Sequence, residues 1–112
     1  HASADGVAVI AHDPDLSRVA GRPQRVDQLT AAELARLDLG AEQHLPTLAE
    51  TLDAFPDARF NIDLKSVGAV ASAVEAVRAA HAVDRVLLTS FSERRRRAAV
   101  AQLPGVATSA SG

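Results

Sequence analysis

The sequence predicts an α/β fold in which helices cover a parallel sheet, and three observations support this prediction. Residues 60–65 alternate between apolar and polar side chains, as in a strand with one buried face. Residues 67–81 then place apolar side chains at helical spacing. A second β-branched and apolar run at 86–90 is again followed by a helical segment. Because parallel neighbours need crossover connections, this alternation predicts a parallel sheet.

Composition favours small-molecule chemistry over large polyanionic partners. The chain has 112 residues, 47% hydrophobic and 23% charged, with a formal net charge of -2. Nucleic-acid binders usually carry excess positive charge, so we expect no nucleic-acid partner. No run approaches the roughly 18 apolar residues of a membrane span, so we expect no transmembrane segment and take the cytoplasm as the expected compartment. The oligomeric state is not fixed by these features.

Residue types exclude several kinds of site. The chain has no cysteine, which excludes disulfides, thiolate metal sites and a cysteine nucleophile. It also lacks a glycine-rich phosphate loop, a nucleophile elbow and an HExxH helix. The sequence starts at His1, enters an apolar run almost at once and stops at 111–112 without a closing helix. We therefore expect residues 1–112 to be an internal fragment of a larger domain.

The N-terminal third combines a short apolar run with a polar region. Residues 7–11 are apolar and β-branched, follow an Asp-Gly turn signal and precede His12-Asp13-Pro14, so they predict a buried strand. Residues 16–28 are polar and irregular and predict a loop that leaves the scaffold.

Two capped helices are expected next. Thr30 and Glu33 form a capping box, Leu29 is placed to staple onto Leu34, and the helix is predicted to end near Gly40.

The second capped helix is predicted from Thr47 to Phe55. Thr47 and Glu50 have the same capping spacing, Leu48, Leu52 and Phe55 share one face, and a proline follows at 56.

The C-terminal half is predicted to repeat strand and helix. Strands are expected at 60–65, 86–90 and 106–108, with helices at 67–81 and at 93–103, the latter capped by Ser92. An open sheet and a barrel both fit this order. In a barrel, the strand face toward the helices is apolar and the inner face near the C-terminal mouth is polar, which is the division seen at 60–65.

Polar side chains at two strand ends are the candidate site. His12 follows the apolar run with Asp13 beside it, where a neutral imidazole can transfer protons; the alternative is a histidine that caps a strand end. Asp63 and Lys65 project to one side of a strand and offer a carboxylate for a divalent cation and an ammonium for a phosphate. The alternative there is an ordinary ion pair.

Other charged groups are interpreted as structural. Residues Arg94 to Arg97 are four consecutive arginines that spread round a helix, so a solvated face is expected rather than one patch. His44 and His81 are also expected to be structural.

Several motifs in order resemble the glycerophosphodiester phosphodiesterase family. The resemblance covers nearly the whole chain, and the combination is far more specific than any one motif. It rests on residues 5–13 (DGVAVIAHD), 16–19 (LSRV), 45–50 (LPTLAE), 61–65 (NIDLK) and 90–91 (SF).

The resemblance implies a fold, an activity and roles for three residues. The fold would be a partial TIM (β/α)8 barrel of the phospholipase-C-like phosphodiesterase type, with residues 16–39 as a polar insertion that carries a short helix. The activity would be hydrolysis of glycerophosphodiesters to glycerol 3-phosphate and an alcohol with Mg²⁺ or Ca²⁺. By the same resemblance, His12 would be a catalytic acid or base, Asp63 a metal ligand and Lys65 the group that binds the substrate phosphate.

Two departures from the family pattern limit these implications. Asp63 stands where glutamate is commoner, which shortens the arm by one methylene. The family's first histidine, in a His-Arg-Gly motif, and its Glu-x-Asp metal pair would precede His1, so we expect the chain alone to be inactive. The alternatives are a related phospholipid phosphodiesterase, or a non-catalytic member that binds glycerophosphodiesters or a protein partner.

Overall fold

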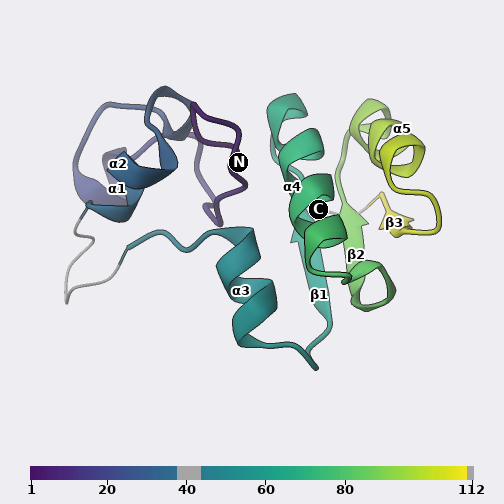
Figure 1. The fold of residues 1–112 in the computed structure, drawn as a ribbon. Helices are drawn as coiled ribbons and strands as arrows, with labels where there is room; N and C mark the ends of the chain where they lie inside the picture. The colour runs from purple at the N-terminus through teal and green to yellow at the C-terminus, as the bar shows by residue number, and fades with distance from the viewer. Residues whose placement is uncertain (38–43, 111–112) are drawn as a thin grey trace.

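The computed structural model describes residues 1–37 and 44–110, apart from the side chain of residue 19. In these residues the helices and strands alternate in the C-terminal half, and the N-terminal third contains short helical turns (Figure 1). The elements are α1 (Ser17–Ala20), the 3-10 turn η1 (Val26–Gln28), α2 (Ala31–Ala35), α3 (Leu48–Ala54), β1 (Phe60–Asp63), α4 (Val67–Ala79), the 3-10 turn η2 (Val83–Arg85), β2 (Val86–Thr89), α5 (Glu93–Gln102) and β3 (Ala107–Ser109).

The sheet has three parallel strands in the order β1-β2-β3, which confirms the predicted parallel sheet. Asp63 pairs with Thr89, and Thr89 pairs with Ser109, so the three strands end at one edge. Each strand begins or ends within two residues of its predicted bounds. The loops that follow β1 and β2 leave from this carboxyl edge.

The main core lies between the sheet and helices α3, α4 and α5. Leu64 is buried, and Phe60 and Ile62 pack against the same cluster, as the alternation of this strand predicts. α4 crosses the strands and contacts α3 and α5 on either side (Figure 1). The remaining buried members are Ala8, Leu48, Leu52, Val70, Ala73, Val74, Val77, Ala82, Val86, Leu88, Ala99, Leu103 and Val106.

The apolar stripe of α4 is confirmed over its middle turns and fails at both ends. Val70, Val74 and Val77 are buried, whereas Val67, in the first turn, is 61% exposed. The helix ends at Ala79, and His81 beyond it has a φ of 52°, in the left-handed region. The predicted stripe is therefore shorter than the sequence pattern.

A second apolar cluster, the N-terminal core, corrects the prediction that residues 16–28 are loop. It consists of Val9, Leu16, Val26 and Leu34, all buried, with Leu29 packed against them. This segment closes on itself, because the Leu16 N–H donates to the Gln24 carbonyl and the Val26 N–H donates to the Pro14 carbonyl. Leu16 and Val26 stand in a polar stretch interrupted by Gly21 and Pro23, so the sequence pattern did not indicate their burial.

Residues 7–11 do not form the predicted buried strand. Ala8 and Val9 are buried, but each makes a single antiparallel bridge, Ala8 to Ala2 and Val9 to Thr47, and Ile10 is 42% exposed. Because consecutive residues bond to two different segments, no continuous ladder forms. The segment is extended but stands outside the parallel sheet.

The helix caps were predicted well, and the helix ends less well. Thr30 Oγ1 accepts from the Glu33 N–H and the Glu33 carboxylate accepts from the Thr30 N–H, which confirms the capping box. The helix ends at Ala35 instead of near residue 40, and residue 40 lies outside the described residues. Thr47 caps α3 as predicted, whereas Phe55 is 58% exposed. No helix in the described ranges has the length and apolar character to cross a bilayer.

Arg85 joins the end of α3 to the strand that follows η2. Its guanidinium donates to the carbonyl oxygens of Leu52 (3.0 Å), Phe55 (3.0 Å) and Ala58 (3.3 Å). The last carbonyls of a helix have no partners within the helix, and a cation there also favours the helix dipole. Arg85 therefore binds three carbonyls where the chain turns from α3 into β1, and the Phe55 carbonyl among them also accepts from the Ala58 N–H.

Replacing Arg85 should destabilise the fold. Arg85→Ala removes three charge-assisted bonds from half-buried carbonyls, so the free energy of unfolding should fall by about 2 kcal/mol. Denaturant unfolding of the complete protein measures this, with Arg59→Ala as the control because it removes an exposed arginine nearby. Equal stability of the two variants would show that the Arg85 bonds contribute nothing.

Candidate functional site

The carboxyl end of β1 carries the first half of the site. Lys65 Nζ lies 2.9 Å from Asp63 Oδ2, and the two side chains are 32% and 27% exposed. Their apolar neighbour Leu64 is buried in the main core, so both charged groups face away from the helices. The structure thus confirms that they share one side, and it also contains the ion pair that the sequence left as the alternative.

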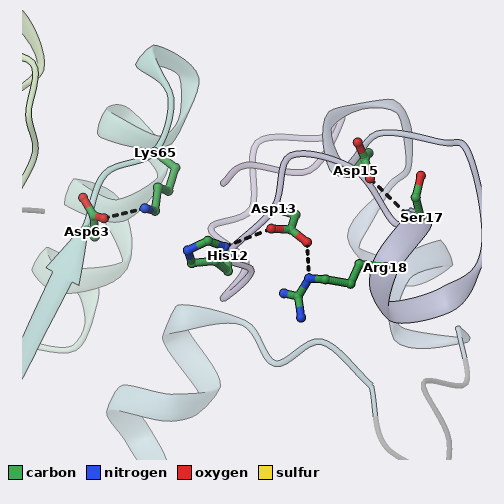
Figure 2. A network of polar contacts seen from close by, with 7 residues as sticks. All are labelled: His12, Asp13, Asp15, Ser17, Arg18, Asp63 and Lys65. Carbon is green, nitrogen blue, oxygen red and sulfur yellow. Dashed lines mark hydrogen bonds and ion pairs between the residues drawn. The ribbon is translucent and has the colours of Figure 1, made fainter.

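The second half is a chain of polar contacts around His12. Its Nδ1 lies 2.9 Å from Asp13 Oδ1, and Arg18 Nε donates to Asp13 Oδ2 at 2.7 Å. Arg18 lies on α1, whose first N–H, at Ser17, donates to Asp15 Oδ1 at 3.0 Å (Figure 2). The short helix therefore sets the arginine against the carboxylate that holds the imidazole.

The charge of Asp13 decides which nitrogen of His12 carries a proton. Hydrogen bonds from the His12 ring and then from Arg18 hold the pKa of the Asp13 carboxyl below its ordinary value of 3.8. An ionised carboxylate only accepts hydrogen bonds, so Nδ1 of His12 is the donor. In the neutral ring Nε2 is then the basic nitrogen, and the imidazole is 75% exposed.

Backbone bonds on both sides fix the segment that leads to His12. The Val9 N–H donates to the His1 carbonyl (2.8 Å), and the Ile10 N–H donates to the Pro46 carbonyl (2.9 Å). The Leu48 N–H donates to the Ala8 carbonyl (2.9 Å). This extended segment is therefore held between the start of the chain and the start of α3.

Figure 2 draws the His12 end of this segment near the end of β1. In Figure 2 the His12 imidazole is drawn between the Asp63–Lys65 pair and Arg18. Figure 2 thus draws the three predicted site residues, His12, Asp63 and Lys65, in one region beyond the carboxyl end of β1.

The fit to a divalent cation is partial. Mg²⁺ and Ca²⁺ bind oxygen ligands, and Asp63 offers one carboxylate at this edge. No group of three or more His, Cys, Asp or Glu side chains within residues 1–37 and 44–110 is arranged to hold a metal. Asp63 therefore fits as one ligand of a metal site and not as the whole of one.

Two of the four consecutive arginines were interpreted wrongly from the sequence. Arg95 and Arg96 are half-buried, and they donate to the carbonyl oxygens of Leu64 (3.0 Å) and Ser90. Arg94 and Arg97 are exposed as predicted. The available signal was position: three of the four arginines, Arg94 to Arg96, lie in the first turn of α5, where cations oppose the helix dipole and so need another reason to be there.

The sequence analysis also gave no role to Arg18, although it noted the motif at 16–19 that contains this residue; the structure shows that Arg18 holds Asp13.

His44 lies outside the site, with Nε2 3.8 Å from Glu50 Oε2, and His81 is exposed beyond α4. Both histidines stay with the structural interpretation.

A parallel α/β unit with a histidine and an acid-lysine pair at its carboxyl edge has the layout of an α/β enzyme, in which loops after the strands carry the chemistry. The family model described as "Glycerophosphoryl diester phosphodiesterase family" matches residues 1–107. The chain belongs to this family, as its motifs predicted.

Known proteins of this family resemble the chain over nearly its whole length. The "Probable glycerophosphodiester phosphodiesterase 2" of Mycobacterium tuberculosis (strain ATCC 25618 / H37Rv) is 43% identical over 111 residues, which are 99% of this chain and 42% of that protein. The chain thus spans less than half the length of this relative.

Solved structures show the same fold. The glycerophosphodiester phosphodiesterase of Agrobacterium tumefaciens str. C58 has a TM-score of 0.85 and 27% identity, covering 96% of this chain and 50% of that one. An Oleispira antarctica phosphodiesterase in complex with sn-glycerol-3-phosphate has a TM-score of 0.84 and 28% identity, covering 96% and 49%. The fold prediction is confirmed: the three-stranded unit is a partial α/β barrel of this family.

The contact between Arg18 and Asp13 makes a prediction about titration. Arg18→Ala removes one of the two bonds that favour the carboxylate, so the pKa of Asp13 should rise toward 3.8 and the exposed His12 ring should lose part of its support. Because the folded pKa of Asp13 is depressed, its contribution to stability is present above the ordinary carboxyl pKa and is lost as the pH falls through the lowered value.

Carbon-13 NMR titration of the Asp13 carboxyl measures this shift. Arg22→Ala removes an exposed arginine from the same loop and should leave the pKa unchanged. An Asp13 pKa that is the same in Arg18→Ala and in the unmodified protein would show that the 2.7 Å contact has no electrostatic effect.

Proposed function

We propose that the protein containing this chain hydrolyses glycerophosphodiesters to glycerol 3-phosphate and an alcohol. The observation that supports this proposal is a carboxylate-held imidazole and an acid-lysine pair, which Figure 2 draws in one region, in a chain of this family. The product bound to the Oleispira antarctica phosphodiesterase, sn-glycerol-3-phosphate, supports the choice of substrate class.

His12 is assigned the proton transfers. With Nδ1 donating to Asp13, Nε2 is able to take a proton from an attacking hydroxyl or, once protonated, to give one to a leaving alcohol. The Asp13 carboxylate keeps the ring in this tautomer and stabilises the imidazolium, and the Arg18 guanidinium holds the other oxygen of that carboxylate. Together these contacts orient an exposed ring that has no packed pocket of its own.

Lys65 and Asp63 are assigned the charged groups of the substrate complex. The Lys65 ammonium binds a phosphate oxygen, and the Asp63 carboxylate is one ligand of Mg²⁺ or Ca²⁺. The phosphodiester is negative and the cation is positive, so Lys65 and Asp63 would each exchange the contact between them for a partner of opposite charge. When bound, the cation neutralises negative charge on the phosphodiester.

The remaining groups of the site are proposed to come from parts of the family domain beyond these residues. The described part of the chain supplies one candidate for proton transfer, His12, and one candidate metal ligand, Asp63, and the chain spans 42% of the Mycobacterium tuberculosis relative. We therefore propose that residues 1–112 act as a fragment of that domain and do not complete the reaction alone. The cytoplasm stays a prediction from the sequence.

Replacing His12 tests the proposed function. In the complete protein with glycerophosphocholine as substrate, His12→Ala should lower kcat by roughly 10²- to 10⁴-fold, the usual contribution of a general acid or base. His44→Ala removes an exposed histidine outside the site and should keep full activity. The measurement is the release of glycerol 3-phosphate, which a chelator should stop and added Mg²⁺ or Ca²⁺ should restore.

Other results would identify the alternatives. Full activity of His12→Ala would remove His12 from catalysis. Turnover of intact phospholipid without turnover of glycerophosphocholine would indicate the related phospholipid phosphodiesterase. Binding of glycerophosphocholine with no release of glycerol 3-phosphate, with Mg²⁺ or Ca²⁺ supplied, would indicate a non-catalytic member.

A further inference from the structure

The ladder between β1 and β2 ends in an unusual way at Leu64. The Leu64 N–H donates to the Thr89 carbonyl at 2.8 Å, which continues the parallel pairing. In a regular parallel ladder the next bond, to the Leu64 carbonyl, would come from the backbone N–H of residue 91. The chain instead turns at 90–92 into α5, and the Leu64 carbonyl accepts from Ser90 Oγ (3.3 Å) and Arg95 Nη1 (3.0 Å). Side chains therefore replace the missing backbone donor.

The position of Arg95 is unfavourable for α5 itself. Ser92 caps this helix, with its Oγ accepting from the Arg95 N–H at 3.2 Å, so Arg95 lies in the first turn. A cation in the first turn opposes the helix dipole. Arg95 Nε is also buried with no hydrogen-bond partner among the residues that the structure describes, which adds a desolvation cost. Helix stability alone does not account for an arginine here.

The carbonyl that Arg95 holds belongs to the residue between the two charged groups of the site. Leu64 separates Asp63, which pairs with Thr89, from Lys65, which lies beyond the last paired residue of β1. The peptide between Leu64 and Lys65 carries the held carbonyl, so its orientation sets the direction in which the Lys65 side chain leaves the strand. The contact fixes the backbone just where the sheet stops fixing it.

We propose that Arg95 is a positioning residue for the phosphate-binding end of β1, where it holds the Leu64 carbonyl and thereby aims Lys65 and Asp63 at the substrate phosphate and its cation. This assignment rests on the proposed function of Lys65 and Asp63. Arg96 makes the matching contact on the neighbouring strand, to the Ser90 carbonyl. The two arginines, from one turn of α5, thus donate hydrogen bonds to carbonyls at the ends of two adjacent strands.

A double-mutant cycle tests the proposal in the complete protein. Arg95→Ala should lower kcat/KM for glycerophosphocholine by roughly 10- to 100-fold, because small displacements of a positioned group are costly. The matched control is Arg94→Ala, which removes an exposed arginine from the same turn and should have little effect. In a Lys65→Ala background, Arg95→Ala should cause a smaller fold-loss, because one of the two groups that it aims is gone.

Equal fold-losses from Arg95→Ala with and without Lys65 would overturn the proposal, as would no loss in the protein that keeps Lys65. Arg95→Lys separates charge from geometry. A lysine keeps the positive charge but lacks the planar fork, so the activity should stay well below that of the unmodified protein. Full activity of Arg95→Lys would show that charge alone is required.

Amide hydrogen exchange tests the contact without any assay of activity. Arg95→Ala should speed exchange at the Leu64 amide, which donates to the Thr89 carbonyl at the end of the ladder, and leave the β1–β2 pairs before Leu64 protected; Arg94→Ala should change neither. Unchanged exchange in Arg95→Ala would overturn the proposal whatever the enzyme assays give. If the exchange changes but the unmodified protein does not hydrolyse glycerophosphocholine, the proposed function fails and the role of Arg95 in holding the strand end is kept.

Discussion

Burial of one face of β1 is the constraint on which the rest of the structure depends. Leu64 is buried beneath the helices, and Phe60 and Ile62 pack against the same cluster. Because side chains alternate along a strand, Asp63 and Lys65 must then face the other way. Parallel pairing ends the three strands at one edge, so these two charges stand where the loops after the strands gather. The apolar core thus decides where the polar site is.

His12 reaches this edge through a different constraint. Ala8 belongs to the main core and its neighbour Val9 to the N-terminal core, so the extended segment lies between two apolar clusters. Its backbone is paired on both sides, which compensates for the absence of a regular ladder. Asp13 and Arg18 then orient a ring that is mostly exposed. Packing sets the direction of the segment, and the charged groups of Asp13 and Arg18 set the orientation of the imidazole.

Periodic and capping signals were sufficient for the C-terminal half, and non-local contacts decided the rest. The alternation at 60–65 and the caps Thr30, Thr47 and Ser92 each depend on residues a few positions apart, and the structure confirms them. The burial of Leu16 and Val26 depends on a loop that closes on itself, which local spacing does not encode. The same is true of Arg95, whose acceptor lies 31 residues away.

Sequence predicted which residues form the site more fully than how they are held. His12, Asp63 and Lys65 were predicted from the sequence, whereas the supporting contacts of Arg18 and Arg95 emerged from the structure. The most direct test of this account is a crystal structure of the complete protein with sn-glycerol-3-phosphate and Mg²⁺ or Ca²⁺. The account predicts that the phosphate lies within hydrogen-bond distance of Lys65 Nζ, with His12 Nε2 facing the ligand and Asp63 on the cation. A phosphate bound elsewhere, with the Asp63–Lys65 pair intact, would contradict it.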